Sequence, residues 1–305
     1  MVSEKFLLIV NQTSGLGRGR KYEKWLRKMS QKVHDKRIDI ICSPRDGYNS
    51  IENLSKRARK EGYSRVIVAG GDGSCHEAAN GLVISGIPLG IIPLGTGNDF
   101  SKGLGLPQSI KEAFWVAVSG KEAFVDLGMV DGRFFVNVVS FVFDAQIIQM
   151  IPEFKKNLNF LPSKGLYLLA LLKNLSLPMS FPEVRINNGK VERILGLVVT
   201  NGPQYGGMFK IAPRASFTDG LLDVCLIGEM DKLKLMENLP RVLNGTHDLL
   251  PEVKMGRTSS LVVSSFEELT CEVDGEIFDS KKEYIITAHP EALRVIVPPN
   301  SKLLQ

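Results

Sequence analysis

The segment that most constrains this chain is Gly70-Gly71-Asp72-Gly73-Ser74, which stands directly after an apolar run and directly before an amphipathic one. Three glycines let backbone approach a ligand closely, and the first turn of a helix offers unpaired N–H groups and a positive dipole end. An acidic residue inside such a turn favours a magnesium nucleotide, or orientation of a hydroxyl, over plain phosphate binding. The simpler interpretation is a tight turn capped by a Ser-x-x-Glu box at Ser74 and Glu77.

Two further glycine segments follow other expected strands. The sequence PLGTGNDF at 93–100 again combines flexible backbone with a carboxylate, although a helix cap by Asn or Asp would explain it alone. A third segment, at 11–19, lacks the glycine that G-x-G-x-x-G requires, because position 20 is Arg20. The chain has no Walker-type phosphate loop and no protein-kinase signature. Because ligands bind at the carboxyl ends of parallel strands, we expect these loops to converge on one edge of a sheet.

Short apolar runs alternate with amphipathic stretches in the first third of the chain, which is typical of a doubly wound α/β domain. The pattern predicts strands at 6–10, 38–42, 66–69 and 88–92, and helices at 20–33, 50–60, 74–85 and 110–119. After about residue 125 the pattern changes to short strands at 128–130, 134–138, 184–186 and 191–200. The turns Asp131-Gly132 and Asn187-Asn188-Gly189 are hairpin signals. Helices are expected near 165–175 and 232–243.

We therefore predict an N-terminal nucleotide-binding domain over residues 1–125, which the run 291–305 returns to complete, and a β-rich, sandwich-like domain over 126–290. The active site is expected in the cleft between them. The apolar run 134–151 is interrupted by polar residues, which favours a buried strand leading into a helix over a membrane span. The interrupting residues are Asn137, Ser140, Asp144, Gln146 and Gln149.

Charge is unevenly distributed along the chain. Residues 1–65 hold 16 Lys and Arg against 7 Asp and Glu, a net charge of +9, whereas the whole chain has +5. The basic helix 20–33 is expected to lie against an anionic surface, with a solvated helix face as the simpler alternative. Trp25 and Met29 on this helix would either contact the membrane or pack in the core. The four cysteines have no metal-ligand spacing and indicate free thiols in a reducing compartment. We expect a cytoplasmic protein.

Together these residues resemble the diacylglycerol kinase catalytic-domain family, which includes bacterial lipid kinases and, more distantly, sphingosine and ceramide kinases. The similar segments run through almost the whole chain in the family's order. They are N-x-x-S-G at 11–15, GGDGS at 70–74, PLGTGNDF at 93–100, FVNVVSFVFDA at 135–145, KGLYLL at 164–169, NGPQYGGMFKIAPRASFTDGLLDV at 201–224 and VDGEIF at 273–278.

The resemblance implies an ATP- and Mg²⁺-dependent lipid kinase and assigns roles to residues of this sequence. The proton acceptor would be Glu276, with Asp274 and Asp72 as the other candidates. The turn Asp-Gly-Leu-Leu would hold Mg²⁺ through the Asp219 carboxylate and the main-chain carbonyls of Ser216 and Leu221. Nucleotide contacts are expected from Asn11, Ser43, Gly70, Gly71, Asp72, Gly73, Ser74, Cys75, His76, Glu77, Gly95, Thr96, Gly97, Asn98 and Asp99.

The chain departs from the family pattern at two of these positions. Ser74 stands where the family most often has threonine, and Val142 stands where it commonly has glycine. The expected acceptor is a lipid alcohol such as diacylglycerol, and the apolar residues around 160–172 are expected to line its acyl pocket. Peripheral contact with the inner face of the membrane is expected, nucleic acid is not expected as a partner, and a homodimer is left open. The alternatives are an NAD-kinase-like nucleotide kinase and a non-catalytic nucleotide or lipid sensor.

Overall fold

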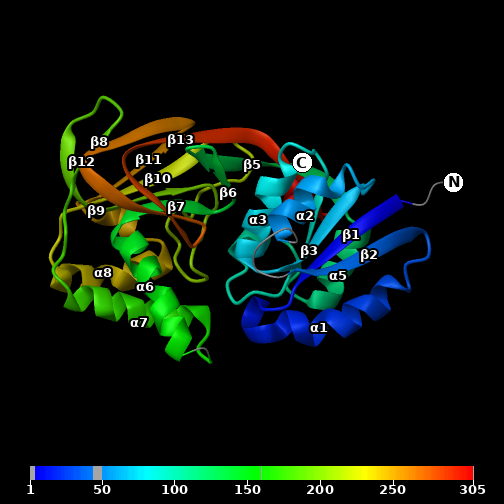
Figure 1. Cartoon of the computed structure of the whole chain (residues 1–305). Coiled ribbons are helices and arrows are strands. Elements are labelled where there is room, and N and C mark those ends of the chain that lie inside the picture. The colour runs from blue at the N-terminus through cyan, green and yellow to red at the C-terminus, as the bar shows by residue number, and fades with distance from the viewer. Residues whose placement is uncertain (1–3, 44–49, 159, 305) are drawn as a thin grey trace. The chain divides into compact units, whose positions relative to one another are not determined.

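The computed structural model describes residues 4–43, 50–158 and 160–304. The chain forms two compact units, Met1–Asp126 with Glu291–Gln305 and Leu127–Pro290 (Figure 1). The break between the units lies one residue from the boundary expected between 125 and 126. The expected architecture, an α/β domain followed by a β-rich domain, is confirmed.

The first unit is built on a parallel sheet with the strand order β2-β1-β3-β4. The strands are β1 (Glu4–Asn11), β2 (Lys36–Ser43), β3 (Arg65–Gly70) and β4 (Leu89–Pro93). The end of β13 (Glu276–Val297) adds a further parallel strand, where Val295 pairs with Leu89. The helices are α1 (Ser14–Ser30), α2 (Ile51–Ala58), α3 (Asp72–Leu82), α4 (Asp99–Gly103) and α5 (Ile110–Ser119). Parallel pairing places the ends of β1, β3 and β4 on one edge, as expected.

Apolar side chains from β1, β3 and β4 form a core against α1 and α5, and Phe6, Leu8, Ile67 and Ile92 are almost completely buried there. Trp25 of α1 packs edge-to-face on Phe114 of α5 at a centroid distance of 5.8 Å, and Met29 packs against the same core. The structure therefore assigns Trp25 and Met29 to core packing and not to a membrane contact.

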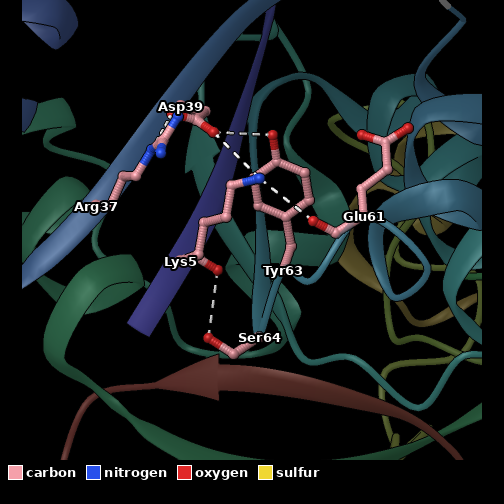
Figure 2. Close-up of polar contacts among 6 residues, drawn as sticks. All are labelled: Lys5, Arg37, Asp39, Glu61, Tyr63 and Ser64. Atoms are coloured by element: carbon pink, nitrogen blue, oxygen red, sulfur yellow. Dashed lines mark hydrogen bonds and ion pairs between the residues drawn. The ribbon is translucent and has the colours of Figure 1, made fainter. Parts of the chain in front are cut away.

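A polar cluster fixes the edge strand β2 to β1 and to the segment before β3 (Figure 2). Asp39 of β2 accepts a hydrogen bond from the Tyr63 hydroxyl at 3.0 Å and pairs with Lys5 of β1 at 3.5 Å. Arg37 donates to the other Asp39 oxygen at 3.0 Å. Burial, together with the bond to Asp39, raises the pKa of Tyr63 to about 12. This phenol therefore stays protonated and remains a donor near neutral pH.

The second unit is an antiparallel sheet with the order β11-β10-β9-β7-β12-β13, in which β8 pairs with β12 and β9, and β6 pairs with β5. The strands are β5 (Lys121–Val130), β6 (Arg133–Phe135), β7 (Val138–Val142), β8 (Glu183–Ile186), β9 (Val191–Thr200), β10 (Leu222–Gly228), β11 (Val253–Thr258) and β12 (Ser260–Val273). Asp131 and Gly132 both have positive φ, 45° and 87°, as the predicted Asp-Gly hairpin turn requires. In the second predicted turn the positive φ, 52°, falls on Asn187 and not on the Asn188-Gly189 pair.

Three helices, α6 (Phe143–Asn157), α7 (Ser163–Ser176) and α8 (Lys232–Asn244), pack on one face of this sheet (Figure 1). Their apolar residues meet Val138, Val198 and Cys225 of the strands. The apolar run 134–151 becomes β6, β7 and the first turns of α6, as predicted. Within the described residues, no helix combines the length and hydropathy that a membrane span needs.

Val142 is strained at the junction of β7 and α6. Its backbone has φ 69° and ψ −108°, a region that β-branched residues avoid and glycine enters freely. Strain of this kind costs about 1 to 3 kcal/mol. The position at which the family commonly has glycine therefore keeps a glycine-like backbone although it carries a buried valine side chain.

A matched pair of substitutions measures this strain. Val142 and Val139 are both buried valines of the same core, but Val139 lies inside β7 with ordinary strand pairing. We expect Val139→Gly to lower the free energy of unfolding by about 1 to 3 kcal/mol more than Val142→Gly, because only the second change relieves strain. Urea unfolding measures both values, and equal losses would show that Val142 is not strained.

Candidate active site

The three glycine loops of the first unit meet at the carboxyl ends of β1, β3 and β4. The Leu94 N–H donates to the Gly70 carbonyl at 2.7 Å. A Cβ on Gly95 would lie 2.7 Å from the Cα of Gly71, and a Cβ on Gly15 would lie 1.9 Å from the Leu94 oxygen. Side chains at these positions would push the loops apart, so glycine is required for the close approach. The convergence expected from the sequence is present.

Asp72 links the loop at 70–74 to the loop at 93–100. It is the first residue of α3, and its Oδ1 accepts the Phe100 N–H at 3.0 Å. The position that a Cβ on Gly97 would occupy lies 3.0 Å from Asp72 Oδ2 and 3.4 Å from Asp99 Oδ2. The two carboxylates therefore border the same small space beside Gly97. Asp99 is buried, whereas Asp72 is only half-buried.

The alternative interpretation of Ser74 and Glu77 as a capping box is wrong. Helix α3 begins at Asp72, two residues before the predicted start, with Gly71 as its N-cap and no side-chain cap. The Ser74 hydroxyl instead accepts a hydrogen bond from Asn11 Nδ2 at 2.9 Å, which ties the end of β1 to α3. Glu77 accepts the Ile51 N–H at the start of α2, 3.1 Å away. Because the helix starts earlier, Ser74 lies inside its first turn and cannot cap it.

Some of the other predicted nucleotide contacts are exposed to solvent, and others are buried. Gly73 is exposed, and Thr96 and Gly97 are partly exposed. The side chains of Cys75 and His76 are buried in α3, and their environment is that of a helix packed on a sheet. Ser43 is buried at the end of β2, and Asn98 has a left-handed backbone and donates to the Gly95 carbonyl at 3.0 Å. The exposed backbone of the loops is thus the surface on which a phosphate can lie.

In the second unit, the two acidic residues of the Asp-Gly-Glu segment differ sharply. Asp274 is buried and accepts three backbone N–H groups, from Val136, Asn137 and Val138, at 2.7, 2.9 and 3.0 Å. Glu276 is exposed at the start of β13 and pairs with Val273 across the turn. Asp274 therefore fixes the β6–β7 connection against the turn, and Glu276 is the residue whose carboxylate is accessible.

The predicted magnesium turn does not fit a cation. Asp219 Oδ2 accepts a hydrogen bond from the Arg257 guanidinium, and Oδ1 accepts the Leu221 N–H at 3.1 Å. Arg257 also lies 3.5 Å from Asp223, its partner in the β10–β11 pairing. A guanidinium between two carboxylates takes the place and the charge that a divalent ion would need. Across residues 4–43, 50–158 and 160–304, no group of three or more His, Cys, Asp or Glu side chains is arranged to hold a metal.

Magnesium should therefore not stabilise this turn. We expect the melting temperature, measured without nucleotide, to be the same in EDTA and in millimolar Mg²⁺. Arg257→Gln should melt slightly lower and gain a Mg²⁺-dependent rise, because the change leaves Asp219 and Asp223 unneutralised. The double variant Arg257→Gln with Asp219→Asn is the control and should lose that rise. A melting temperature of the unaltered protein that falls in EDTA, but not after Asp219→Asn, would contradict this assignment.

Sequence reasoning missed a buried polar cluster at the junction of β7 and α6. Ser140 Oγ lies 2.8 Å from Asp144 Oδ2 and 2.8 Å from Glu272 Oε1. The Tyr167 hydroxyl donates to Asp144 Oδ1 at 2.5 Å. Burial raises the pKa of Asp144, against the effect of these hydrogen bonds, and burial followed by the charge of Asp144 raises that of Glu272 well above its usual range. Ser140 and Asp144 appeared in the sequence only as interruptions of an apolar run, and their spacing of four was the available signal.

Asp144 and Tyr167 line an apolar cavity of about 90 Å³ within the second unit. Among the described residues of its wall, Asp144 is the charged one, and the rest come mainly from β9, α7, α8 and the segment 205–211. Leu171 of α7 belongs to the wall, whereas Phe160, Leu168 and Leu172 are exposed. The segment 160–172 therefore supplies part of an apolar pocket and part of the surface.

Comparisons with known proteins agree with this arrangement. Residues 5–130 match the family model of the diacylglycerol kinase catalytic domain, and residues 137–297 match that of the YegS C-terminal NAD kinase beta sandwich-like domain. A diacylglycerol kinase of Staphylococcus carnosus (strain TM300) is 30% identical over 232 residues, 73% of each chain. A probable lipid kinase YegS-like of Chromohalobacter salexigens is 32% identical over 256 residues, which cover 82% of this chain and 81% of that one.

A crystal structure of a putative diacylglycerol kinase from Bacillus anthracis str. Sterne has a TM-score of 0.77 and 23% identity over 98% of this chain and 96% of that one. At this identity the likeness concerns the fold, which it supports for both units. The two family models and the level of identity to the relatives decide the assignment. The chain belongs to the diacylglycerol kinase catalytic-domain family, a family of lipid kinases.

Proposed function

We propose that this protein is an ATP- and Mg²⁺-dependent kinase that transfers the γ-phosphoryl group to the hydroxyl of diacylglycerol or a similar lipid alcohol. The observation that carries the proposal is the convergence of three glycine loops with two carboxylates, Asp72 and Asp99, at one edge of the first sheet. Phosphoryl transfer needs mainly positioning and electrostatic stabilisation, which such a backbone cradle supplies.

The nucleotide end of the reaction would use the exposed loop backbone and the N-terminus of α3. Helix N-termini favour negative charge, and Gly71 to Gly73 place this one beside the 93–98 loop. Asp72 and Asp99 border one small space and have the oxygen ligands that Mg²⁺ prefers. Mg²⁺ bound there would neutralise charge on the phosphate oxygens. Asp72 Oδ1 also accepts the Phe100 N–H, so the same residue joins the two loops.

Glu276 is the residue that we propose as proton acceptor. The acceptor hydroxyl must lose a proton as it attacks the phosphorus, and a carboxylate within about 2.6 to 3.2 Å can take it. Asp274 is buried, and its oxygens already accept three backbone N–H groups. To take a proton from the substrate it would have to give up these bonds, which would disrupt the turn. Glu276, two residues later, keeps an exposed carboxylate on a strand that this turn fixes in place.

The acceptor lipid would place apolar carbons in the cavity of the second unit. A cavity of about 90 Å³ lined by side chains such as Phe141, Leu171 and Leu239 accepts part of an acyl chain. Asp144 on its wall offers lone pairs to a hydroxyl donor, since a carboxylate has about four acceptor sites. These features support a lipid alcohol over a soluble nucleotide as the acceptor.

Contact with the membrane would run through the basic face of α1. Arg20, Lys21, Lys24 and Lys28 are exposed there, and each Lys or Arg near an anionic surface contributes about 1 kcal/mol. With Trp25 and Met29 in the core, the contact is electrostatic and should weaken with salt. We expect glutamate at positions 20, 21 and 24 to reduce sedimentation with phosphatidylglycerol vesicles, and Lys111→Glu on α5 to leave it unchanged. Equal sedimentation of all three proteins would exclude this face.

Radiolabelled ATP tests the proposed function directly. The full chain would be incubated with labelled ATP, Mg²⁺ and vesicles that contain diacylglycerol, monoacylglycerol or a sphingoid base, with NAD as a soluble acceptor in a separate reaction. We expect label in a lipid product. Labelled NADP without a labelled lipid would establish the nucleotide kinase instead, and ATP binding without any labelled product would establish a sensor.

A further inference from the structure

The cluster of Ser140, Asp144 and Glu272 holds more acceptor oxygens than one hydroxyl can satisfy. Ser140 Oγ lies 2.8 Å from a carboxyl oxygen of each acid. A serine hydroxyl has a single hydrogen and can donate to one of them. The other contact would set two acceptor oxygens against each other unless that carboxyl carries a proton and donates it to Ser140. At least one of the two carboxyls in this geometry therefore carries a proton.

The bonds on the far side of each acid locate the proton. Asp144 Oδ1 accepts the Tyr167 hydroxyl at 2.5 Å, which is within the range of a hydroxyl bound to a charged carboxylate. Glu272 is completely buried, and its Oε2 accepts the Gly275 N–H at 2.7 Å. Asp144 reaches the cavity wall, whereas Glu272 does not line it. A charge is less costly on Asp144, which is half-buried and accepts the Tyr167 hydroxyl, than on Glu272, which is fully buried.

The other titratable groups around Glu272 also favour its protonated form. Asp144 stands on α6, and Asp274 lies on the same turn as Glu272 with three N–H donors suited to a carboxylate. Tyr205 is buried and Tyr167 of α7 is half-buried near Asp144, and the pKa values of both are raised, first by desolvation and then by the charge of Asp144. Burial, then the charge of Asp144, with a further contribution from Asp274, raises the pKa of Glu272. Two like charges near a buried carboxyl favour its neutral form.

We propose that Glu272 keeps its proton and acts through Ser140 as a positioning residue that holds Asp144 as the carboxylate on the cavity wall. The order of donation is Glu272 to Ser140, Ser140 to Asp144, and Tyr167 to Asp144. Both Asp144 oxygens are then fixed and each keeps a lone pair for a hydroxyl. The inference rests on the proposed function in one respect only, namely that the hydroxyl bound by Asp144 belongs to the lipid.

Amide substitutions locate the proton without any substrate. In Glu272→Gln, the amide nitrogen can donate to Ser140 and the amide oxygen can accept from Gly275, as the protonated acid does. We expect this variant to match the unaltered protein in urea unfolding at about pH 8, or to exceed it. Asp144→Asn must turn an NH₂ group toward the Ser140 or the Tyr167 hydroxyl and should be destabilised. Glu272→Ala should be destabilised as well, because alanine cannot donate to Ser140 or accept from Gly275. Stability lost in the alanine variant should therefore be retained in the glutamine variant.

The pH dependence of unfolding supplies the readout that a merely structural role would not change. The pKa of Glu272 is raised in the folded protein, so its contribution to stability is complete below its ordinary pKa of about 4.3 and is lost as pH rises through the folded value. One such proton changes the unfolding equilibrium constant by up to about tenfold per pH unit. Between about pH 5 and 8, the unfolding equilibrium constant of Glu272→Gln should change with pH by one proton less than that of the unaltered protein.

Two results would overturn the proposal. A Glu272→Gln protein as unstable as Glu272→Ala, or one with an unchanged pH dependence, would show that Glu272 is not the protonated acid. A tolerated Asp144→Asn beside a destabilised Glu272→Gln would place the proton on Asp144. Because each measurement is made without ATP or lipid, these outcomes are independent of whether the kinase assay succeeds.

Discussion

Replacing Glu276 with glutamine should lower kcat for lipid phosphorylation by about 10²- to 10⁴-fold, the usual contribution of a general base. Glutamine keeps the size of the side chain but cannot accept the proton of the attacking hydroxyl. Glu276 is exposed at the start of β13, so its loss should not change the melting temperature or the Kd for ATP. Steady-state kinetics with labelled ATP, calorimetry and thermal unfolding measure these three quantities.

The control for Glu276→Gln lies on the same strand. Glu283 of β13 is also exposed and pairs through its backbone with Ser264. Glu283→Gln makes the identical chemical change without a role in the reaction and should retain full kcat. If Glu276→Gln retains kcat while Asp72→Asn loses it without loosening the loops, the proton acceptor is Asp72 and the assignment to Glu276 is wrong.

The sequence predicted the first unit well because its elements have strong, regular signals. The strands at 6–10, 66–69 and 88–92 are continuous β-branched or apolar runs, and they fall within β1, β3 and, to one residue, β4. Buried parallel strands produce such runs because both faces are covered. The start of α1 was harder, since positive φ angles at Gly15, Leu16 and Gly17 interrupt its first turn before the regular helix.

The strands β10, β11 and β12, and the part of β13 before residue 291, were not predicted as elements. In β12, register shifts between Ser264 and Leu269 and again before Cys271 break the two-residue alternation that identifies a half-buried strand. The pairing of β7 with both β9 and β12 also joins residues more than 50 apart, which local patterns do not contain. The fold of the second unit was therefore accessible mainly through the family resemblance.

The same limit applies to the site residues. The glycine loops are local in sequence, so their convergence followed from strand order alone. Asp274 stayed a candidate proton acceptor beside Glu276 in the sequence, because only the fold shows that Val136, Asn137 and Val138 donate their N–H groups to it. Arg257 stands 38 positions after Asp219, so no local pattern links this guanidinium to the expected metal turn.

Asp274 is expected to be a structural residue, and its removal should be among the most destabilising single changes in the second unit. Its two oxygens accept three backbone N–H groups at 2.7 to 3.0 Å, and its own N–H donates to the Val138 carbonyl at 3.0 Å. Hydrogen bonds to a charged group contribute about 1.5 to 3 kcal/mol each, and buried donors left without an acceptor add a further penalty. Asp274→Ala should therefore lower the free energy of unfolding by about 3 kcal/mol or more.

Urea unfolding with linear extrapolation measures this loss, and comparison with Glu276 separates structure from chemistry. Asp274→Ala should reduce stability and, through the loosened turn, activity, whereas Glu276→Ala should reduce activity and change stability by less than about 0.5 kcal/mol. Asp274→Asn keeps one acceptor oxygen but turns NH₂ toward an N–H donor, so it should fall between the two. An Asp274→Asn protein with full stability and no turnover would reverse this division, because it would make Asp274 the reacting carboxylate and leave Glu276 without a role.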